Sequence, residues 1–469
     1  MNKDLEFIKE TLKDSFDIKY REINSMLGKA TIVFADVLCS TAFISDYIVK
    51  PLIKEKRDDI NTQEDIISKV LQINIVDFAK DKDDAVFHII SGDAVIVFEE
   101  YEKIIYCETK SFAKRSIGIP LTESVIKGPR EGFSEAFVDN VALIRRRIKN
   151  KDLKFEAMFL GENSQTVVCL TYIDGLAPKK LVNQVREKIK NLNYSFILDT
   201  NYIETELRAK KTLFDTVGYT EKADELSSKV LEGRVAVIVD GTPFVITVPY
   251  FFLENFQNPD DYYLNRYFVM FSRTLRYLGF FIAMFLPGFY VALITYHFSM
   301  IPSLFVFRLA VSRAGVPFPV FLEVIIMMIF FQLIREAGLR LPQPIGSAMS
   351  IVSALILGDA AVGAGVASRI TILIVAISSL CYFLIPKAYN AVSVWSILIV
   401  IASALLGLPA FLFITLALLA HLGDLRSVDY PFLFPLATLK DYRFRDVIFR
   451  GKLNRISKKV IDNDEENNN

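Results

Sequence analysis

Histidine, cysteine and tryptophan are scarce in this sequence, whose 469 residues include 3 His, 4 Cys and 1 Trp. The histidines and cysteines are widely separated, and none share the spacing of a metal site: His88, His297, His421, Cys39, Cys107, Cys169 and Cys381. We therefore expect neither a zinc site nor a disulfide framework. The cysteines are interpreted as reduced packing residues, and no metal or other cofactor is expected.

Catalytic signatures are also missing. No glycine-rich phosphate loop follows a strand-like run, and no Ser/His/Asp or Cys/His set emerges. Asp240-Gly241-Thr242 lies between two apolar runs, where Asp-Gly is a strong hairpin signal rather than part of a phosphate site. The sequence predicts no enzymatic activity, and no nucleic-acid partner is expected.

Charged residues are distributed unevenly along the chain. Residues 1–269 carry 43 acidic and 37 basic side chains, whereas residues 270–469 carry 11 and 17. This shift predicts a soluble region followed by a membrane region, with the boundary near Asn265. The N-terminus, "MNKDLEFIKETLKDSF", lacks the basic-then-apolar pattern of a signal peptide, so the soluble region is expected to be cytoplasmic.

The soluble region mixes strand-like and helix-periodic segments and is predicted to be α/β. "TIVFADV" (31–37) is predicted as a buried strand and "LVNQVREKIKNL" (181–192) as an amphipathic helix. An internal repeat pairs "TIVF" at 31 with "TVVC" at 166, and "GDAVIVFEEYEKII" (92–105) with "GRVAVIVDGTPFVI" (233–246). These matches indicate two related subdomains, residues 1–127 and 128–264, although short apolar hairpins also recur in unrelated folds.

A helix is predicted within "GPREGFSEAFVDNVALIRRRI" (128–148), where Phe133, Phe137, Val141 and Ile144 form one apolar face. Three arginines, residues 145–147, form the C-terminal end of this helix, where positive charge suits the negative end of the helix dipole. Two interpretations stay open. The arginines form a solvated basic end, or they contact another subunit or the membrane surface.

The membrane domain, residues 265–440, is expected to have about four spans. The apolar stretches are residues 276–297, 318–334, 370–386 and 392–422. The last is long enough to be tilted or broken at Gly407-Leu408-Pro409, and residues between the first two are interpreted as a loop. Six spans result if residues 346–365 also cross and the last stretch is two helices. The tail, residues 441–469, is basic and then acidic, and is expected to be cytoplasmic.

Glu323 is the single charge within the second apolar stretch. A carboxylate facing lipid costs a few kcal/mol, so we expect it to face protein or water. Glu323 is therefore a functional candidate. The alternative is a structural pair with Arg308 or Arg313 of the preceding loop.

The segment "GSAMSIVSALILGDAAVGAG" (346–365) combines small residues with an acid. Drawn as a helix, it carries a ridge of small side chains, formed by Gly346, Ser350, Ala354, Gly358, Ala361 and Gly365. Such ridges let membrane helices approach closely. Pore, gating or packing candidates in this segment are Gly346, Ser350, Ser353, Ala354, Gly358, Asp359, Ala361 and Gly365. A polar side lining a transport pathway and a simple helix contact both remain open.

Several segments together resemble one family, the GerA family of spore germinant receptor A subunits from endospore-forming bacteria. Besides residues 128–148 and 346–365, they are "LEGRVAVIVDGTPFVITVP", "PDDYY", "SRTLRYLGFFIAMFLPGFYVALITYH", "PFPVFLEVIIM" and "REAGLRLPQPIG". The resemblance covers roughly residues 125–440. It marks as motif candidates Gly128, Pro129, Arg130, Glu131, Arg335, Glu336, Arg340 and Pro342. At Asp359 relatives more often carry Gln, so the ridge is the stronger expectation than an ion-binding role for Asp359.

The resemblance implies a multi-pass protein of the spore inner membrane. It implies a transporter-like B subunit and a lipoprotein C subunit as partners, surrounding membrane lipids, and assembly of the A subunit into a homo-oligomeric, ligand-gated cation channel. Alternatives are a secondary transporter, a non-conducting scaffold subunit, or a paralogue that amplifies ion release.

Overall fold

Two five-stranded antiparallel sheets organise the N-terminal half of the chain. The first contains β1 (Ile18–Ser25), β2 (Gly28–Ala35), β3 (Val76–Phe78), β4 (Asp93–Phe98) and β5 (Ile105–Glu108), in the order β1-β2-β4-β5-β3. The second contains β6 (Leu153–Leu160), β7 (Thr166–Ile173), β8 (Gly218–Thr220), β9 (Val235–Val239) and β10 (Val245–Val248), in the order β6-β7-β9-β10-β8. Both sheets therefore have the same topology.

The sequence repeat corresponds to this shared topology. "TIVF" lies in β2 and "TVVC" in β7, each the second strand of its sheet. The two longer matched segments supply the hairpins β4–β5 and β9–β10, which also occupy equivalent places. The turn of the second hairpin carries Gly241 at φ 89°, as the Asp-Gly signal predicts.

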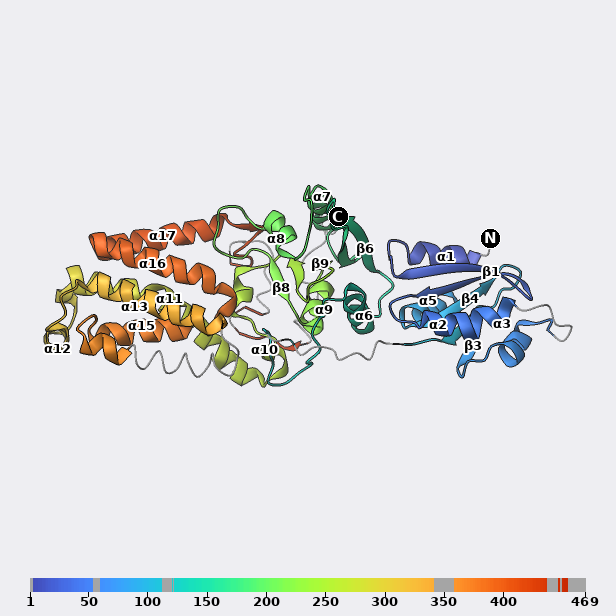
Figure 1. The fold of residues 1–469 in the computed structure, drawn as a ribbon, viewed down its shortest axis with the longest axis horizontal. Coiled ribbons are helices and arrows are strands. Elements are labelled where there is room, and N and C mark those ends of the chain that lie inside the picture. Colours follow the sequence, from blue (N-terminus) through green and yellow to red (C-terminus); the bar gives the residue numbers. More distant parts are fainter. Residues whose placement is uncertain are drawn as a thin grey trace. The chain divides into compact units, whose positions relative to one another are not determined.

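This computed structural model describes residues 3–53, 60–111, 120, 122–340, 358–436, 446–447 and 449–453. The chain divides into two compact units. The α/β unit contains residues up to Arg208 and Val217–Tyr250, and the helical unit contains Ala209–Thr216 and Phe251–Lys452 (Figure 1).

The first sheet is buried on both faces because the side chains of its central strands alternate. Ile32 and Phe34 of β2 pack into a core with α2 (Thr41–Ile44) and α3 (Lys50–Ile53). Val33 packs on the opposite face with α1 (Lys3–Thr11) and α5 (Lys82–Ile90). The short helix α4 (Gln63–Asp65) continues into a π-helical turn, Ile66–Val70, that also joins the first core.

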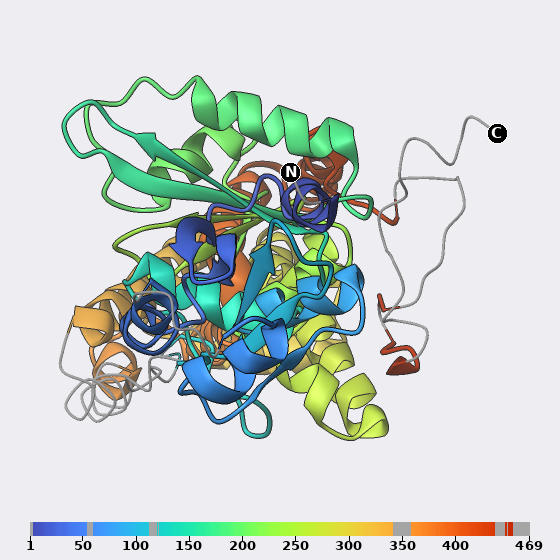
Figure 2. The ribbon, with the colours of Figure 1, turned by 90° about the vertical axis from the view of Figure 1, so that its right-hand side faces the viewer.

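The second sheet is also covered by helices. Its core includes α6 (Phe137–Arg147) and α9 (Ala223–Leu231) packed on β7, β9 and β10. The amphipathic helix α7 (Lys179–Lys190) packs on the same sheet (Figure 2). Its Arg186 donates to the Glu156 carboxylate of β6 at 2.8 Å. The helix α8 (Asn201–Leu207) follows α7. The predicted strand at 31–37 and helix at 181–192 are both confirmed.

The predicted helix of residues 128–148 begins later than its apolar spacing indicated. α6 starts at Phe137 because the Asp240 carboxylate accepts from the Phe137 N–H at 3.2 Å. Phe133 precedes the helix but is buried in the same core. The solvated interpretation of the arginines is wrong for Arg145, which is fully buried.

The helical unit begins with α10 (Asp260–Tyr263) and α11 (Arg266–Tyr296). It continues with α12 (Ser303–Arg313), α13 (Val320–Arg340), α15 (Arg369–Tyr382), α16 (Tyr389–Leu406) and α17 (Leu408–Asp424), followed by the short strands β11 (Arg426–Ser427) and β12 (Tyr430–Pro431). The expected loop before the second apolar stretch is thus corrected, because residues 303–313 form a helix that starts directly after Pro302.

Helix lengths within the described part of this unit bear on membrane crossing. Two segments, 266–296 and 386–406, are long and apolar enough to span a membrane, and α15 and α17 are shorter apolar helices. The last apolar stretch is broken at Gly407, where φ is 70°, which is one of the two alternatives that the sequence left open; the four-span expectation treats this stretch as a single span. Asn265, near which the sequence places the start of the membrane region, caps α11, and Pro287 lies inside that helix without ending it.

Candidate functional site at one end of the helical unit

Only part of the predicted small-residue ridge falls within the described residues. Gly346, Ser350, Ser353, Ala354 and motif residue Pro342 lie outside the described residues. Residues 358–363 are helical, with Asp359 exposed and Ala361 buried. A Cβ at Gly358 would meet open space, so this glycine is not needed for packing within the described chain.

Gly365 does not continue the ridge, which corrects the sequence prediction. Its φ of 69° is left-handed and lies in the turn that ends this helix. A Cβ there would also lie 3.1 Å from the Gly315 carbonyl oxygen. The glycine is therefore required by backbone conformation and close approach, not by a helix contact.

Glu323 is completely buried near the start of α13 and is held by three donors. Its Oε1 accepts from Arg313 Nε at 3.1 Å, and its Oε2 accepts from the Ser368 N–H and the Thr371 hydroxyl, both at 2.9 Å. The structure thus gives Glu323 the pairing with Arg313 that the sequence offered as one alternative. A buried carboxylate is tolerated when it is paired and hydrogen-bonded in this way.

Local sequence explains why these groups meet. Arg313 is the last residue of α12, and the turn through Gly315 and Pro317 brings the chain back to α13. Ser368 caps α15, since its hydroxyl accepts from the Thr371 N–H at 3.2 Å. Glu323 therefore also faces the positive end of the α15 dipole.

Hydroxyl groups extend this cluster into the helix core. The Thr371 hydroxyl lies 2.9 Å from that of Ser368 and 3.1 Å from the Tyr290 hydroxyl of α11. The set of Arg313, Glu323, Ser368, Thr371 and Tyr290 therefore links α11, α12, α13 and α15. We call it the Glu323 cluster. It ties four helices together through polar side chains.

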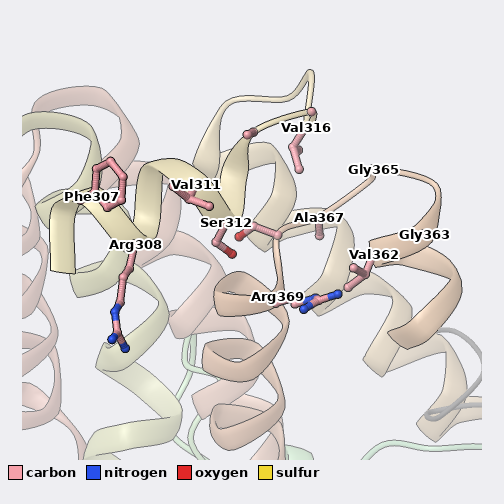
Figure 3. A pocket seen from close by; sticks show the side chains of 13 residues that line it. Phe307, Arg308, Val311, Ser312, Val316, Val362, Gly363, Gly365, Ala367 and Arg369 are labelled. Carbon is pink, nitrogen blue, oxygen red and sulfur yellow. The ribbon is translucent and has the colours of Figure 1, made fainter. Parts of the chain in front are cut away.

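A cavity of about 650 Å³ lies beside this cluster, between α12 and the segment that leads into α15 (Figure 3). Its walls include Phe307, Arg308 and Ser312 from α12, and Ser368 and Arg369 from the start of α15. Sequence reasoning had assigned Arg308 only as a possible partner of Glu323. The structure gives that role to Arg313 and places Arg308 on the cavity wall.

Charges at the other end of α11 are neutralised internally. The Asp261 carboxylate accepts from Arg273 and Arg276, both buried, at 2.9 Å and 2.5 Å. Asp446 pairs with Arg273 at 2.7 Å and accepts from the Tyr262 hydroxyl at 2.6 Å. Sequence reasoning assigned no role to these residues, although Asp261 and Tyr262 lie within the quoted "PDDYY" motif.

Most of the remaining motif candidates within the described residues have structural partners. Glu131 pairs with Arg147 at 2.5 Å, and Lys222 donates to the Pro129 carbonyl at 2.7 Å, beside Gly128 and the exposed Arg130. In α13, Arg335 lies over the Tyr389 ring, and Arg340 pairs with Glu336 on the surface. None of these contacts brings the motif residues to the cavity.

Side chains that could hold a metal do not gather in the parts of the chain that are described, where no group of three or more His, Cys, Asp or Glu residues was found. The four cysteines are free, and Cys39, Cys107 and Cys169 are buried in the α/β unit. The functional candidates are therefore the Glu323 cluster, the cavity and the open glycine at 358.

A family model and several known proteins match this sequence over nearly its whole length. The family model described as "Bacillus/Clostridium GerA spore germination protein" matches residues 6–460. "Spore germination protein KA" of Bacillus subtilis is 34% identical over 455 residues, covering 94% of this chain and 83% of that protein. "Uncharacterized membrane protein YfkQ" of the same organism is also 34% identical, covering 93% and 86%.

A solved structure is also similar in sequence. It is the crystal structure of the N-terminal domain of the A subunit of the Bacillus megaterium spore germinant receptor GerK3, at 30% identity and a TM-score of 0.41. The match covers 53% of this chain and 94% of that domain.

Proposed function

The chain belongs to the GerA family of spore germination proteins, and on this premise we propose that it is the A subunit of a nutrient-responsive germinant receptor. In this proposal the subunit oligomerises in the spore inner membrane and forms a ligand-gated cation channel. Ion release then begins germination, and the subunit performs no chemical catalysis.

Membrane residence is supported by the apolar surface of the helical unit. On α11, Phe271, Leu275, Leu278 and Phe281 recur on one face and are exposed. On α17, Leu412, Phe413, Leu416 and Leu419 are exposed as well. A contiguous surface of this kind is unfavourable in water but suits lipid or a partner helix.

Oligomer formation is supported by a contrast between glycines. Cβ atoms at Gly279 and Gly288 would approach Leu384 and Ile399 to 2.8 Å and 2.6 Å, so these glycines allow close packing within the chain. Within the described part of the chain, a Cβ at Gly358 or Gly363 would have no neighbour within 4 Å. Small residues that meet no neighbour among the described residues are suited to close helix packing between subunits, and this contrast is the observation that carries the proposal.

The Glu323 cluster supports a role in gating. Ionisable residues within membrane segments are rare, and they commonly mark ion pathways or moving parts. Here one buried carboxylate holds α12, α13 and α15 together through Arg313, Ser368 and Thr371. A shift of any of these helices breaks a charge-assisted contact, so the cluster is placed to couple helix position to channel opening.

The proposed partners and topology are carried over from the family resemblance. We propose that the chain assembles with a transporter-like B subunit and a lipoprotein C subunit. The α/β unit and the C-terminal tail lie in the cytoplasm, because the basic residues of 440–459 favour that side.

The test is conductance of the purified full-length chain in a planar bilayer, comparing wild type, Gly358→Leu and the control Gly423→Leu. Gly423 belongs to α17 and meets equally open space. We expect discrete cation-selective openings in wild type and control, and altered or absent openings in Gly358→Leu. Spores carrying Gly358→Leu should fail to germinate on nutrient.

Two outcomes contradict the channel. Saturable uptake of a labelled solute by this chain alone indicates a transporter. A silent bilayer after co-reconstitution with the B and C subunits, from a well-folded complex, indicates a scaffold.

A further inference from the structure

The cavity beside the Glu323 cluster has two cationic walls. Arg308 projects from α12 and Arg369 begins α15, and both are exposed. Among the described residues neither forms an ion pair, whereas Arg313, the last residue of α12, is paired with Glu323. Both carboxylate oxygens of Glu323 accept hydrogen bonds from Arg313, Ser368 and Thr371. Glu323 therefore does not neutralise the arginines that line the cavity.

The balance of charge differs between the two ends of α11. At its start, Arg273 and Arg276 are neutralised by Asp261 and Asp446. At its other end, Arg308 and Arg369 have no such counter-charge within the described chain. Cationic residues at a membrane surface are favourably neutralised by anionic lipid phosphates.

A polar group without a partner also lines the cavity. The Ser312 hydroxyl is buried and has no hydrogen-bond partner among the described residues. Figure 3 shows it on the wall of α12 that faces the segment leading into α15. A buried hydroxyl without a partner costs free energy, which a ligand oxygen accepting from it would offset.

The rest of the lining is apolar. Phe307, Val311, Val316 and Val362 contribute to the walls, and α12 buries none of its residues. Leu304 and Phe305 of the same helix are also exposed. A short apolar helix that carries an unpaired arginine midway along it, as α12 carries Arg308 among the described residues, is suited to the boundary between headgroups and acyl chains.

We propose that this cavity binds an anionic phospholipid, with its phosphate held by Arg308 or Arg369 and by the Ser312 hydroxyl, and with acyl carbons against Phe307 and Val311. Figure 3 shows the two guanidinium groups on different sides of the cavity rather than converging on one point. That spacing favours an extended amphiphile over a small free phosphate, although both share the same anionic group. The proposal rests on the membrane residence proposed above, but not on conductance.

The experiment is native mass spectrometry of the detergent-purified full chain, titrated with dimyristoyl phosphatidylglycerol, with dimyristoyl phosphatidylcholine, or with inorganic phosphate. The variants are Arg308→Gln, Arg369→Gln, the double variant, and Arg426→Gln as a control. Arg426 is exposed in the same unit and does not line the cavity. Size-exclusion profiles and melting temperatures establish that each variant is folded.

We expect wild type and the control to retain phosphatidylglycerol in preference to phosphatidylcholine. Each single variant should bind about fivefold more weakly, and the double variant about thirtyfold. Arg308→Lys/Arg369→Lys should restore most of the binding, because the charge is kept. Undiminished retention by the folded double variant overturns the site, and displacement of lipid by millimolar inorganic phosphate overturns its assignment to lipid. Native mass spectrometry measures lipid binding independently of conductance. A failure of the channel proposal in the planar bilayer is therefore distinguishable from a failure of the lipid site.

Discussion

Arg145 and Asp17, 128 residues apart in the sequence, form a two-pronged ion pair in which both side chains are fully buried. The guanidinium donates through Nε at 3.1 Å and through an Nη at 2.9 Å, and another Nη donates to the Leu153 carbonyl at 3.3 Å. Asp17 precedes β1 and Arg145 belongs to α6, so the pair joins the two sheets of the α/β unit.

Removing one partner of this pair should be strongly destabilising. Asp17→Asn leaves a buried, uncompensated guanidinium, and we expect a loss of roughly 3–5 kcal/mol in the free energy of unfolding. Urea unfolding of the full chain in detergent, followed by circular dichroism, measures it. Asp83→Asn, which breaks the exposed pair with Lys151, should leave the free energy of unfolding nearly unchanged, because water screens exposed ion pairs. Equal losses in the two variants would contradict a structural role for the buried pair.

The Glu323–Arg313 pair should respond asymmetrically to neutralisation. Glu323 is fully buried, whereas the Arg313 side chain is 28% exposed and can be hydrated alone. Arg313→Gln should therefore cost about 3 kcal/mol or more, and Glu323→Gln distinctly less, since Gln keeps an oxygen for Ser368 and Thr371. Melting temperatures in detergent give the ranking. The double variant Arg313→Glu/Glu323→Arg should not recover the lost stability, because a cation at position 323 would face the positive end of the α15 dipole. Full recovery of the wild-type melting temperature would refute this account.

Acid should weaken the α/β unit partly through Glu156. Burial raises the pKa of this carboxyl, but hydrogen bonds from Arg186 and Tyr172 outweigh it, and the pKa is lowered below its ordinary 4.5. The group therefore contributes stability above pH 4.5 that is lost as pH falls through the lowered pKa. Glu156→Gln should be less stable at pH 7 and show a shallower decline below pH 4.5 in urea midpoints. An unchanged slope would mean that other carboxyls dominate.

Glycines of the helical unit should separate into two classes. Gly288→Ala places a Cβ 2.6 Å from Ile399 Cγ2 and should destabilise the fold by about 1–3 kcal/mol. Gly358→Ala adds a Cβ that meets no neighbour among the described residues, and it should leave the melting temperature unchanged or higher, because Ala favours helix. A comparable loss at both positions would show that Gly358 packs within the subunit.

Much of the fold follows from local sequence patterns. The strand at β2, the helix α7 and the hairpin at Asp240-Gly241 were predicted because period, turn chemistry and burial agree there. The break between α16 and α17 falls at Gly407 and Pro409, where the sequence left a tilt and a break open.

What could not be predicted depends on distant partners. The three arginines of residues 145–147 look alike locally, and only the approach of Asp17 selects Arg145 for burial. The cavity likewise needs α12 and the start of α15 to meet, and α12 was missed because its apolar residues show no buried face. Glu323 was found because a lone acid in an apolar stretch is a signal in itself.

The charge network at the start of α11 has a consequence for the order in which the chain is made. Arg273 finds Asp261 twelve residues away, but its second carboxylate, Asp446, lies 173 residues further on. During translation, α11 is therefore synthesised well before Asp446, the second carboxylate that pairs with Arg273. A chain terminated before position 446 keeps an unbalanced guanidinium there, so the closing contact distinguishes finished polypeptides from truncated ones.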